Sequence, residues 1–297
     1  MDHTMVDAER LSCGIPELDK HLGGGLIPGT LAVVMGSTGI GKTQLGLSFA
    51  HQGKVEDPCP GIIFDMTSRG DNQNHSDYAA SRYNWKLRSF DSKRNYLAQE
   101  VWESNQFAEY LNLFGGVGRR VSRQDLEFDQ WKAWKAELMQ KLDICIHFFY
   151  SAFVKGARRV VIDGLEPVDR PSESIQLELF EYIYHQILRK EYDWVARDLF
   201  RQHFREQQRQ VEANPYDCAR IGCLMLYTSH ETMLEELIER PLAQGDLLSG
   251  ANTVVLMGKI KQNNEWRRAI YIAKHRGSYC YDQIIPFEVT GQGIVLG

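Results

Sequence analysis

The sequence lacks the features of several protein classes. Its six cysteines are scattered, and none forms the C-x-x-C pair typical of zinc or redox sites. No apolar run approaches the length of a membrane span, and the first residues have neither the basic start nor the apolar core of a signal peptide. The formal net charge is -5, so no basic excess attracts nucleic acid or an anionic membrane. We therefore expect a cytoplasmic chain with free thiols and no membrane partner.

The residues that are present indicate a folded globular protein. Of the 297 residues, 43% are apolar and 25% are charged, which is enough to bury a full core. Alternation of strands and helices predicts an α/β fold with a mostly parallel central sheet and helices on both faces. The expected strands are 31–35, 61–66, 110–114, 158–164, 222–228, 253–257, 269–273 and 286–290, and the expected helices include 128–153 and about 174–188.

The most specific motif is GSTGIGKT, which fits the phosphate-loop pattern G-x-x-x-x-G-K-[ST] between a strand-like and a helix-like run. Its glycines allow successive N–H groups to point at phosphate oxygens. Lys42 would reach the β- and γ-phosphates, and the Thr43 hydroxyl would bind Mg²⁺. The sequence therefore predicts an ATP site formed by Gly36, Ser37, Thr38, Gly39, Ile40, Gly41, Lys42, Thr43 and Gln44.

A carboxylate at the end of a nearby strand is the second part of such a site. The run VVID ends in Asp163 and has this form. In phosphoryl-transfer sites of this kind, an acidic residue helps to hold the Mg²⁺ ion. We therefore expect Thr43 and Asp163 to hold Mg²⁺ together.

Longer stretches resemble one known family. The lead-in LSCGIPELDKHLGGGLIPGTLAVVMGSTGIGKT (residues 11–43) and the tail IAKHRGSYCYDQIIPFEVTGQGIVL (residues 272–296) resemble the two ends of the domain in the KaiC-like branch of the RecA superfamily of P-loop ATPases. VVIDG and YTSH follow in the family's order. The resemblance implies one RecA-like P-loop NTPase domain over residues 1–297, which assembles with copies of itself, typically as a hexamer with nucleotide between neighbours.

In that family a K-x-R near the C-terminus reaches the γ-phosphate held by the adjacent subunit. Lys274 and Arg276 of KHRG occupy these places here. Cations beside the transferred phosphate stabilise its charge, and a finger from a neighbour would couple hydrolysis to assembly. The resemblance thus implies that Lys274 and Arg276 complete the next subunit's site, whereas spacing alone would favour a solvated turn.

The sequence departs from the family after the strand at 61–66. The family carries a Glu there, often a pair, to polarise the attacking water, and Thr67 and Ser68 stand in its place. A hydroxyl can orient water but is a poor base, so we expect slow hydrolysis. Asp65 would lie roughly 7 Å further back, at about 3.3 Å per strand residue. Glu231, after YTSH, is the other candidate for the catalytic carboxylate.

Three functions remain open at this point. The first is a nucleotide-dependent assembly switch with slow or partner-gated ATP hydrolysis. The second is a DNA-dependent ATPase of recombinase or DNA-repair type, and the third, an autokinase, rests only on Ser and Thr residues near the site. In the fold, the loops after VVID and YTSH would grip DNA. Here they are acidic, which places DNA second; their acidic residues are Glu166, Asp169, Glu173, Glu231, Glu235, Glu236, Glu239 and Asp246.

The segment 189–220 is longer than this fold needs between a helix and the next strand. Its apolar stripe includes Trp194, Leu199, Phe200 and Phe204, with Arg and Gln opposite. Such a stripe normally packs on its own domain. The alternative is a helical insertion that binds a protein partner.

Overall fold

The computed structural model describes residues 9–67, 75–103, 107–114, 128–165, 174–240, 247–278 and 280–297, with backbone alone for 128–140, 175, 247 and 248. The helical elements are α1 (Pro16–His21), α2 (Lys42–Glu56), α3 (His75–Tyr83), η1 (Ala98–Trp102), α4 (Phe128–Phe153), α5 (Ile175–Ile183), η5 (Tyr184–Leu188), α6 (Tyr192–Phe200), η6 (Arg201–His203), α7 (Phe204–Ala213), η7 (Cys218–Arg220), α8 (Leu234–Glu239) and α9 (Leu247–Gly250). The strands are β1 (Leu31–Gly36), β2 (Ile62–Asp65), β3 (Tyr110–Asn112), β4 (Arg159–Leu165), β5 (Gly222–Thr228), β6 (Thr253–Gln262), β7 (Glu265–His275), β8 (Ile285–Thr290) and β9 (Gly293–Leu296).

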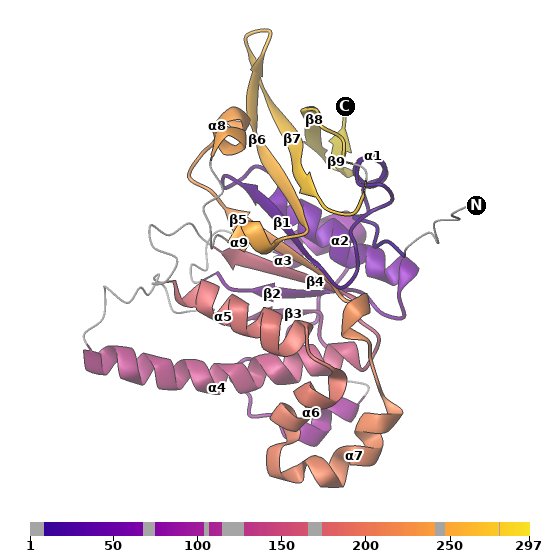
Figure 1. The fold of residues 1–297 in the computed structure, drawn as a ribbon, viewed down its shortest axis with the longest axis vertical. Coiled ribbons are helices and arrows are strands. Elements are labelled where there is room, and N and C mark those ends of the chain that lie inside the picture. Colours follow the sequence, from indigo (N-terminus) through magenta and orange to yellow (C-terminus); the bar gives the residue numbers. More distant parts are fainter. Residues whose placement is uncertain are drawn as a thin grey trace.

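One sheet in the order β3-β2-β4-β5-β1-β6-β7-β8-β9 forms the centre of the described chain (Figure 1). The pairs from β3 to β6 are parallel, and β7, β8 and β9 continue the sheet antiparallel. A two-residue turn, Asn263 and Asn264, joins β6 to β7, and both residues have the positive φ that such hairpins require. The predicted α/β fold with a mostly parallel sheet is thus confirmed, and its last strands form an antiparallel extension.

Strand β1 shows how both faces of the sheet are buried. Leu31, Val33 and Met35 join a core with α4 and α5, whereas Ala32 and Val34 join a core with α1 and α2. Successive side chains of a strand point to opposite faces, so a continuous apolar run fits a strand that is covered on both sides. Figure 1 shows α4 and α5 on one side of the sheet and α2 on the other.

The segment after residue 189 does not form one continuous helix. It forms two helices, α6 and α7, with the short helical turn η6 between them. The chain turns at Arg201, whose φ of 49° is uncommon for a residue other than glycine. Val195 and Phe200 are buried where α6 packs against α4 and η1. Trp194, by contrast, is 60% exposed. The apolar stripe therefore packs largely on the described chain, with Trp194 in solvent.

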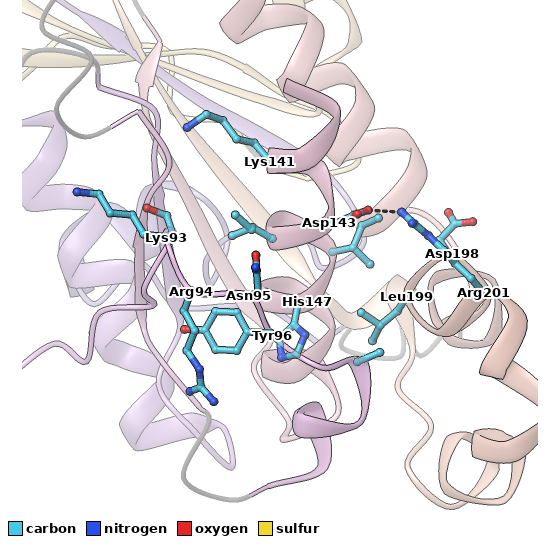
Figure 2. Close-up of a pocket in the computed structure, with 14 residues that line it drawn as sticks. Lys93, Arg94, Asn95, Tyr96, Lys141, Asp143, His147, Asp198, Leu199 and Arg201 are labelled. Carbon is cyan, nitrogen blue, oxygen red and sulfur yellow. Dashed lines mark hydrogen bonds and ion pairs between the residues drawn. The ribbon is translucent and has the colours of Figure 1, made fainter. Parts of the chain in front are cut away.

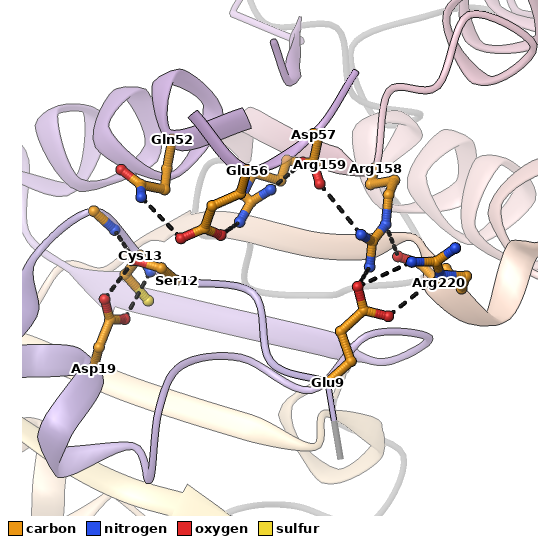
Figure 3. A network of polar contacts seen from close by, with 11 residues as sticks. Glu9, Ser12, Cys13, Asp19, Gln52, Glu56, Asp57, Arg158, Arg159 and Arg220 are labelled. Atoms are coloured by element: carbon orange, nitrogen blue, oxygen red, sulfur yellow. Dashed lines mark hydrogen bonds and ion pairs between the residues drawn. The ribbon is translucent and has the colours of Figure 1, made fainter. Parts of the chain in front are cut away.

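Ion pairs tie the end of α2 to the start of β4 (Figure 3). Arg159 is fully buried and bonds Glu56 and Asp57. Its neighbour Arg158 lies 3.3 Å from Asp57 and 2.7 Å from Glu9. A buried guanidinium needs such partners, because an uncompensated charge in the interior is strongly destabilising. The network thus fixes the C-terminal end of α2 to the sheet.

The six cysteines are free. Burial raises the pKa of the Cys59 thiol to about 12. It is therefore protonated, and a poor nucleophile, at neutral pH. Among the described residues, no helix combines the length and the apolar character that a membrane span requires.

A cavity of about 730 Å³ lies between α4, α6 and the segment before η1 (Figure 2). His147 of α4 lines this cavity but is only 3% exposed. Its ring centroid lies 4.9 Å from that of Tyr96, and its Nε2 has no hydrogen-bond partner within the described part of the chain. Burial lowers the pKa of His147 to about 4, because the imidazolium form would lose its hydration.

His147 should make the protein less stable in mild acid. Its folded pKa of about 4 lies below the ordinary value of 6.5, so the unfolded chain binds the proton first. The stability that the neutral ring supports is complete above about pH 6.5 and is lost as the pH falls toward 4, up to about 3 kcal/mol. Urea unfolding from pH 7 to 4 should show a smaller loss for His147→Leu. Parallel curves for the variant and the wild type would contradict this assignment.

Candidate functional site

The phosphate-loop residues lie between β1, which ends at Gly36, and α2, which begins at Lys42. A Cβ on Gly36 would come within 2.2 Å of the carbonyl oxygen of Met257 on β6, so a larger residue does not fit there. Gly41 precedes the helix with a φ of 128°, a region that side chains disfavour. The helix therefore starts at the loop, and its first N–H groups present a positive end to anions.

Lys42 is buried inside the loop. Its Nζ donates to the carbonyl oxygens of Gly36, at 2.9 Å, and Ser37, at 3.0 Å. Burial lowers the pKa of Lys42 to about 8, although the charge of Asp163 opposes this effect. The ammonium group is thus held within the loop that would surround a phosphate.

Asp163 of β4 contacts α2 across the intervening strand β5. The Thr43 hydroxyl donates to its Oδ2 at 3.0 Å, and the Gly164 N–H donates to its Oδ1 at 2.7 Å. Burial alone would raise the pKa of Asp163, but the hydrogen bond and charge of His75, the Gly164 bond and Lys42 outweigh it and lower the pKa. The structure therefore places the Asp163 carboxylate, with its pKa lowered, beside the Thr43 hydroxyl.

A second buried carboxylate, Asp65 of β2, lies level with Asp163 on the neighbouring strand. His75, the first residue of α3, lies between the two: its Nε2 is 3.0 Å from Asp163 Oδ2 and its Nδ1 is 3.6 Å from Asp65 Oδ2. Burial opposes a charged imidazole, yet the bond to Asp163 and the two negative charges raise the pKa of His75. The pKa of Asp65 is also raised, mainly by burial. The site thus contains two carboxylates and one imidazole with almost no access to water.

Thr67 lies beside this cluster. Its N–H and its hydroxyl both donate to Asp65 Oδ1, at 2.8 and 2.7 Å. A Cβ on Gly164, where φ is 89°, would lie 2.4 Å from the Thr67 nitrogen, so Thr67 sits against the end of β4. Ser68 lies outside the described residues, as do Glu166, Asp169, Glu173 and Asp246 of the two predicted loops.

Glu231 follows β5 at the same edge of the sheet as the phosphate loop. Gly36 pairs with Thr228, and the Ser229 N–H donates to the Gly36 carbonyl at 3.0 Å. The Ser229 hydroxyl donates to the Glu231 carboxylate and lowers its pKa. Glu231 is therefore near the loop, although its carboxylate is engaged within its own turn.

Lys274 and Arg276 lie at the edge of the sheet opposite the phosphate loop, where the parallel strands begin. Through β6, the end of β7 is level with the start of β1, because His275 pairs with Thr253 and Thr253 with Ala32. The phosphate loop begins four residues later on β1, about 13 Å along the strand at 3.3 Å per residue. Lys274 Nζ, at 2.9 Å, and Arg276 Nη2, at 3.4 Å, both donate to the Ser249 carbonyl on α9.

Sequence reasoning missed two residues that contact the site, His75 and Arg82. Arg82 Nη1 bonds the Gln44 side chain at 2.9 Å, and its Nη2 bonds the Gln292 carbonyl in the β8–β9 turn at 2.6 Å. Both residues lie on α3, inside a polar stretch. The spacing of His75, Ala79 and Arg82 is helical and was the available signal.

The oxygen atoms beside the loop fit Mg²⁺, which prefers oxygen ligands. Thr43 and Asp163 would hold it. No group of three or more His, Cys, Asp or Glu side chains in the described ranges could hold a metal by itself. Nucleotide-binding proteins usually hold Mg²⁺ with one or two protein ligands together with phosphates and water.

A family model for the KaiC ATPase matches residues 11–195, which is more than half of the chain. The chain belongs to the KaiC ATPase family. This KaiC-family chain therefore has a P-loop that binds ATP, and proteins of this kind generally bind it with Mg²⁺.

Two curated relatives match a short part of this KaiC-family chain. They are the DNA repair protein RadA of Mycobacterium tuberculosis from strains CDC 1551 / Oshkosh and ATCC 25618 / H37Rv, each 46% identical over 50 residues. The match covers 16% of this chain and only 10% of each relative. This partial similarity is consistent with a shared RecA-like core.

Proposed function

We propose that this chain is a nucleotide-dependent assembly switch with slow or partner-gated ATP hydrolysis. Copies of the chain associate when ATP and Mg²⁺ bind, and hydrolysis reverses the association. The observation that carries the proposal is the position of Lys274 and Arg276 at the sheet edge opposite their own phosphate loop. Both cations contact the Ser249 carbonyl there, too far from the phosphate loop of the same chain to bind a phosphate in it.

A neighbouring subunit supplies the reason for these cations. ATP brings several negative charges to the loop, where Lys42 and the N-terminus of α2 provide only part of the compensation. In a head-to-tail assembly, one subunit's Lys274 and Arg276 reach the γ-phosphate held by the next, and such contacts can repeat until a ring closes. We propose a homo-oligomer, with a hexamer as the size that the family resemblance implies.

Assembly should therefore depend on both ATP and these cations. With Mg²⁺ and a non-hydrolysable ATP analogue, the wild type should assemble in sedimentation velocity runs. Lys274→Ala and Arg276→Ala should need about tenfold more protein, since each removes a charge-assisted contact. Lys261→Ala, an exposed lysine on β6, serves as the control. A wild type that stays monomeric at high concentration with the analogue would refute the shared site.

Slow hydrolysis is proposed from the residues next to the loop. Thr67 has no proton-accepting group comparable to a carboxylate, and Asp65 is held by Thr67, Tyr110 and Asn112. Glu231 is bonded to Ser229. A well-placed base contributes about 10² to 10⁴ in rate, and no carboxylate in the described part of the site is free to provide it.

Thr67→Glu should raise single-turnover ATP hydrolysis by about tenfold, a part of the usual contribution of a base. The gain is limited because the variant loses the Thr67 hydroxyl bond to Asp65. Thr67→Gln has a similar size without a base and should stay slow. Fast hydrolysis by the wild type, unchanged in Thr67→Glu and abolished in Glu231→Gln, would identify Glu231 as the catalytic carboxylate instead.

The helical insertion at 189–220 is a proposed contact for a protein partner. We treat residues 1–297 as one ATPase domain that carries it. Val195 and Phe200 anchor α6 to α4, and Trp194 is left in solvent with the Lys190 ammonium 5.7 Å from its ring. An exposed indole on an anchored helix is a suitable contact for another protein.

A DNA-dependent ATPase is the second candidate. The exposed cations of the β6–β7 hairpin favour it: Lys259, Lys261, Arg267 and Arg268 flank the exposed Trp266. The acidic side chains that α8 exposes, Glu235, Glu236 and Glu239, oppose it. We expect weak DNA binding at moderate salt. Tight, steeply salt-dependent binding in a fluorescence titration would place DNA first.

A further inference from the structure

The buried His75 is not explained by ATP binding or by assembly. It is 2% exposed and lies between Asp65 and Asp163 at the edge of the sheet where nucleotide binds. Its ring is close to that of Tyr110, with centroids 5.4 Å apart. An imidazole in this place is one contact away from Thr43 and the phosphate loop.

The acceptor sites of Asp163 are nearly all occupied. An ionised carboxylate has about four of them, two on each oxygen. Oδ1 accepts from the Gly164 N–H, and Oδ2 accepts from both the Thr43 hydroxyl and His75 Nε2. Because a carboxylate only accepts, His75 must donate through an Nε2–H, which both the neutral and the charged ring can carry. The oxygen that faces Thr43 therefore has no acceptor site left.

Asp65 gives His75 a fixed neighbour but no hydrogen bond. Both oxygens of Asp65 already have two donors each, from Thr67 on one side and from Tyr110 and Asn112 on the other. Nδ1 of His75 has no hydrogen-bond partner among the described residues. The hydrogen bond that holds the ring is thus the one from Nε2 to Asp163. A different ligand of Asp163 could replace this single bond.

We propose that His75 sets how much Mg²⁺ the site requires, by occupying the acceptor site on Asp163 that the metal and its bound water would otherwise use. The proposal rests on the proposed function in that ATP and Mg²⁺ bind beside Thr43 and Asp163. At low Mg²⁺, the Nε2–H keeps Asp163 satisfied without metal. At higher Mg²⁺, the imidazole yields this acceptor site. His75 is therefore a positioning residue that makes nucleotide binding depend on the metal concentration.

Two variants separate the hydrogen bond from the volume of the ring. His75→Leu fills the space without a donor, whereas His75→Gln keeps an N–H that can reach Asp163. The measurement is the binding of a fluorescent ATP analogue at increasing Mg²⁺, with a parallel series in EDTA. We expect the half-saturating Mg²⁺ concentration to fall about tenfold in His75→Leu and to stay within about twofold of the wild type in His75→Gln, as one charge-assisted bond implies. The EDTA series gives the metal-free binding of each protein, from which its dependence on Mg²⁺ is read.

An equal or higher Mg²⁺ requirement in His75→Leu would overturn the inference and would leave His75 as a structural link between α3 and β4. Loss of all nucleotide binding in the wild type would overturn the proposed function as well, so the two failures differ. If His75→Leu does not fold, the wild type decides by NMR with ¹⁵N-labelled histidine. The His75 Nε2 signal should move when Mg²⁺ is added to the ATP-bound protein, and a signal that ignores the metal would overturn the inference.

Discussion

The buried charge of Asp163 is the constraint on which the rest of the site depends. The residue is 1% exposed, and a carboxylate in such a place is stable only when donors surround it. Thr43 supplies one from the phosphate-loop helix, Gly164 supplies one from β4, and His75 supplies one from α3. These bonds place the start of two helices against one strand end. The geometry that would receive Mg²⁺ and phosphate is therefore a result of satisfying one buried group.

The parts of the site that consist of contiguous residues could be predicted from the sequence. GSTGIGKT contains its own glycines, lysine and hydroxyl, and VVID gives Asp163 its place at a strand end. His75 and Arg82 were not found, because their partners lie 88 and 38 residues away and no local pattern marks the pairing. The same limit applies to the fold. The strands had clear apolar runs. The helix break at Arg201 has no glycine or proline to mark it in the sequence, and Arg201 forms an ion pair with the distant Asp143.

The topology of the sheet separates the two sets of cations. Parallel strands bring the ends of β1, β4 and β5 to one edge, where the phosphate loop, Asp163 and Glu231 lie. The antiparallel return of β7 carries Lys274 and Arg276 to the opposite edge. In the proposed assembly, each subunit thus presents its phosphate loop at one edge of the sheet and a finger, the pair Lys274 and Arg276, at the other. Such a surface joins head to tail, which suits a ring better than a symmetric dimer.

The most direct test of this split site is to mix two defective chains. Lys42→Ala has a finger but a weakened loop, and Arg276→Ala has a loop but a weakened finger. We predict that, with Mg²⁺ and a non-hydrolysable ATP analogue, each variant alone remains monomeric in the ultracentrifuge at a protein concentration just sufficient for the wild type to assemble. The mixture should form a one-to-one dimer that grows no further, since only one of its two contacts has both parts. A mixture that stays monomeric, or Arg276→Ala alone assembling like the wild type, would contradict the account.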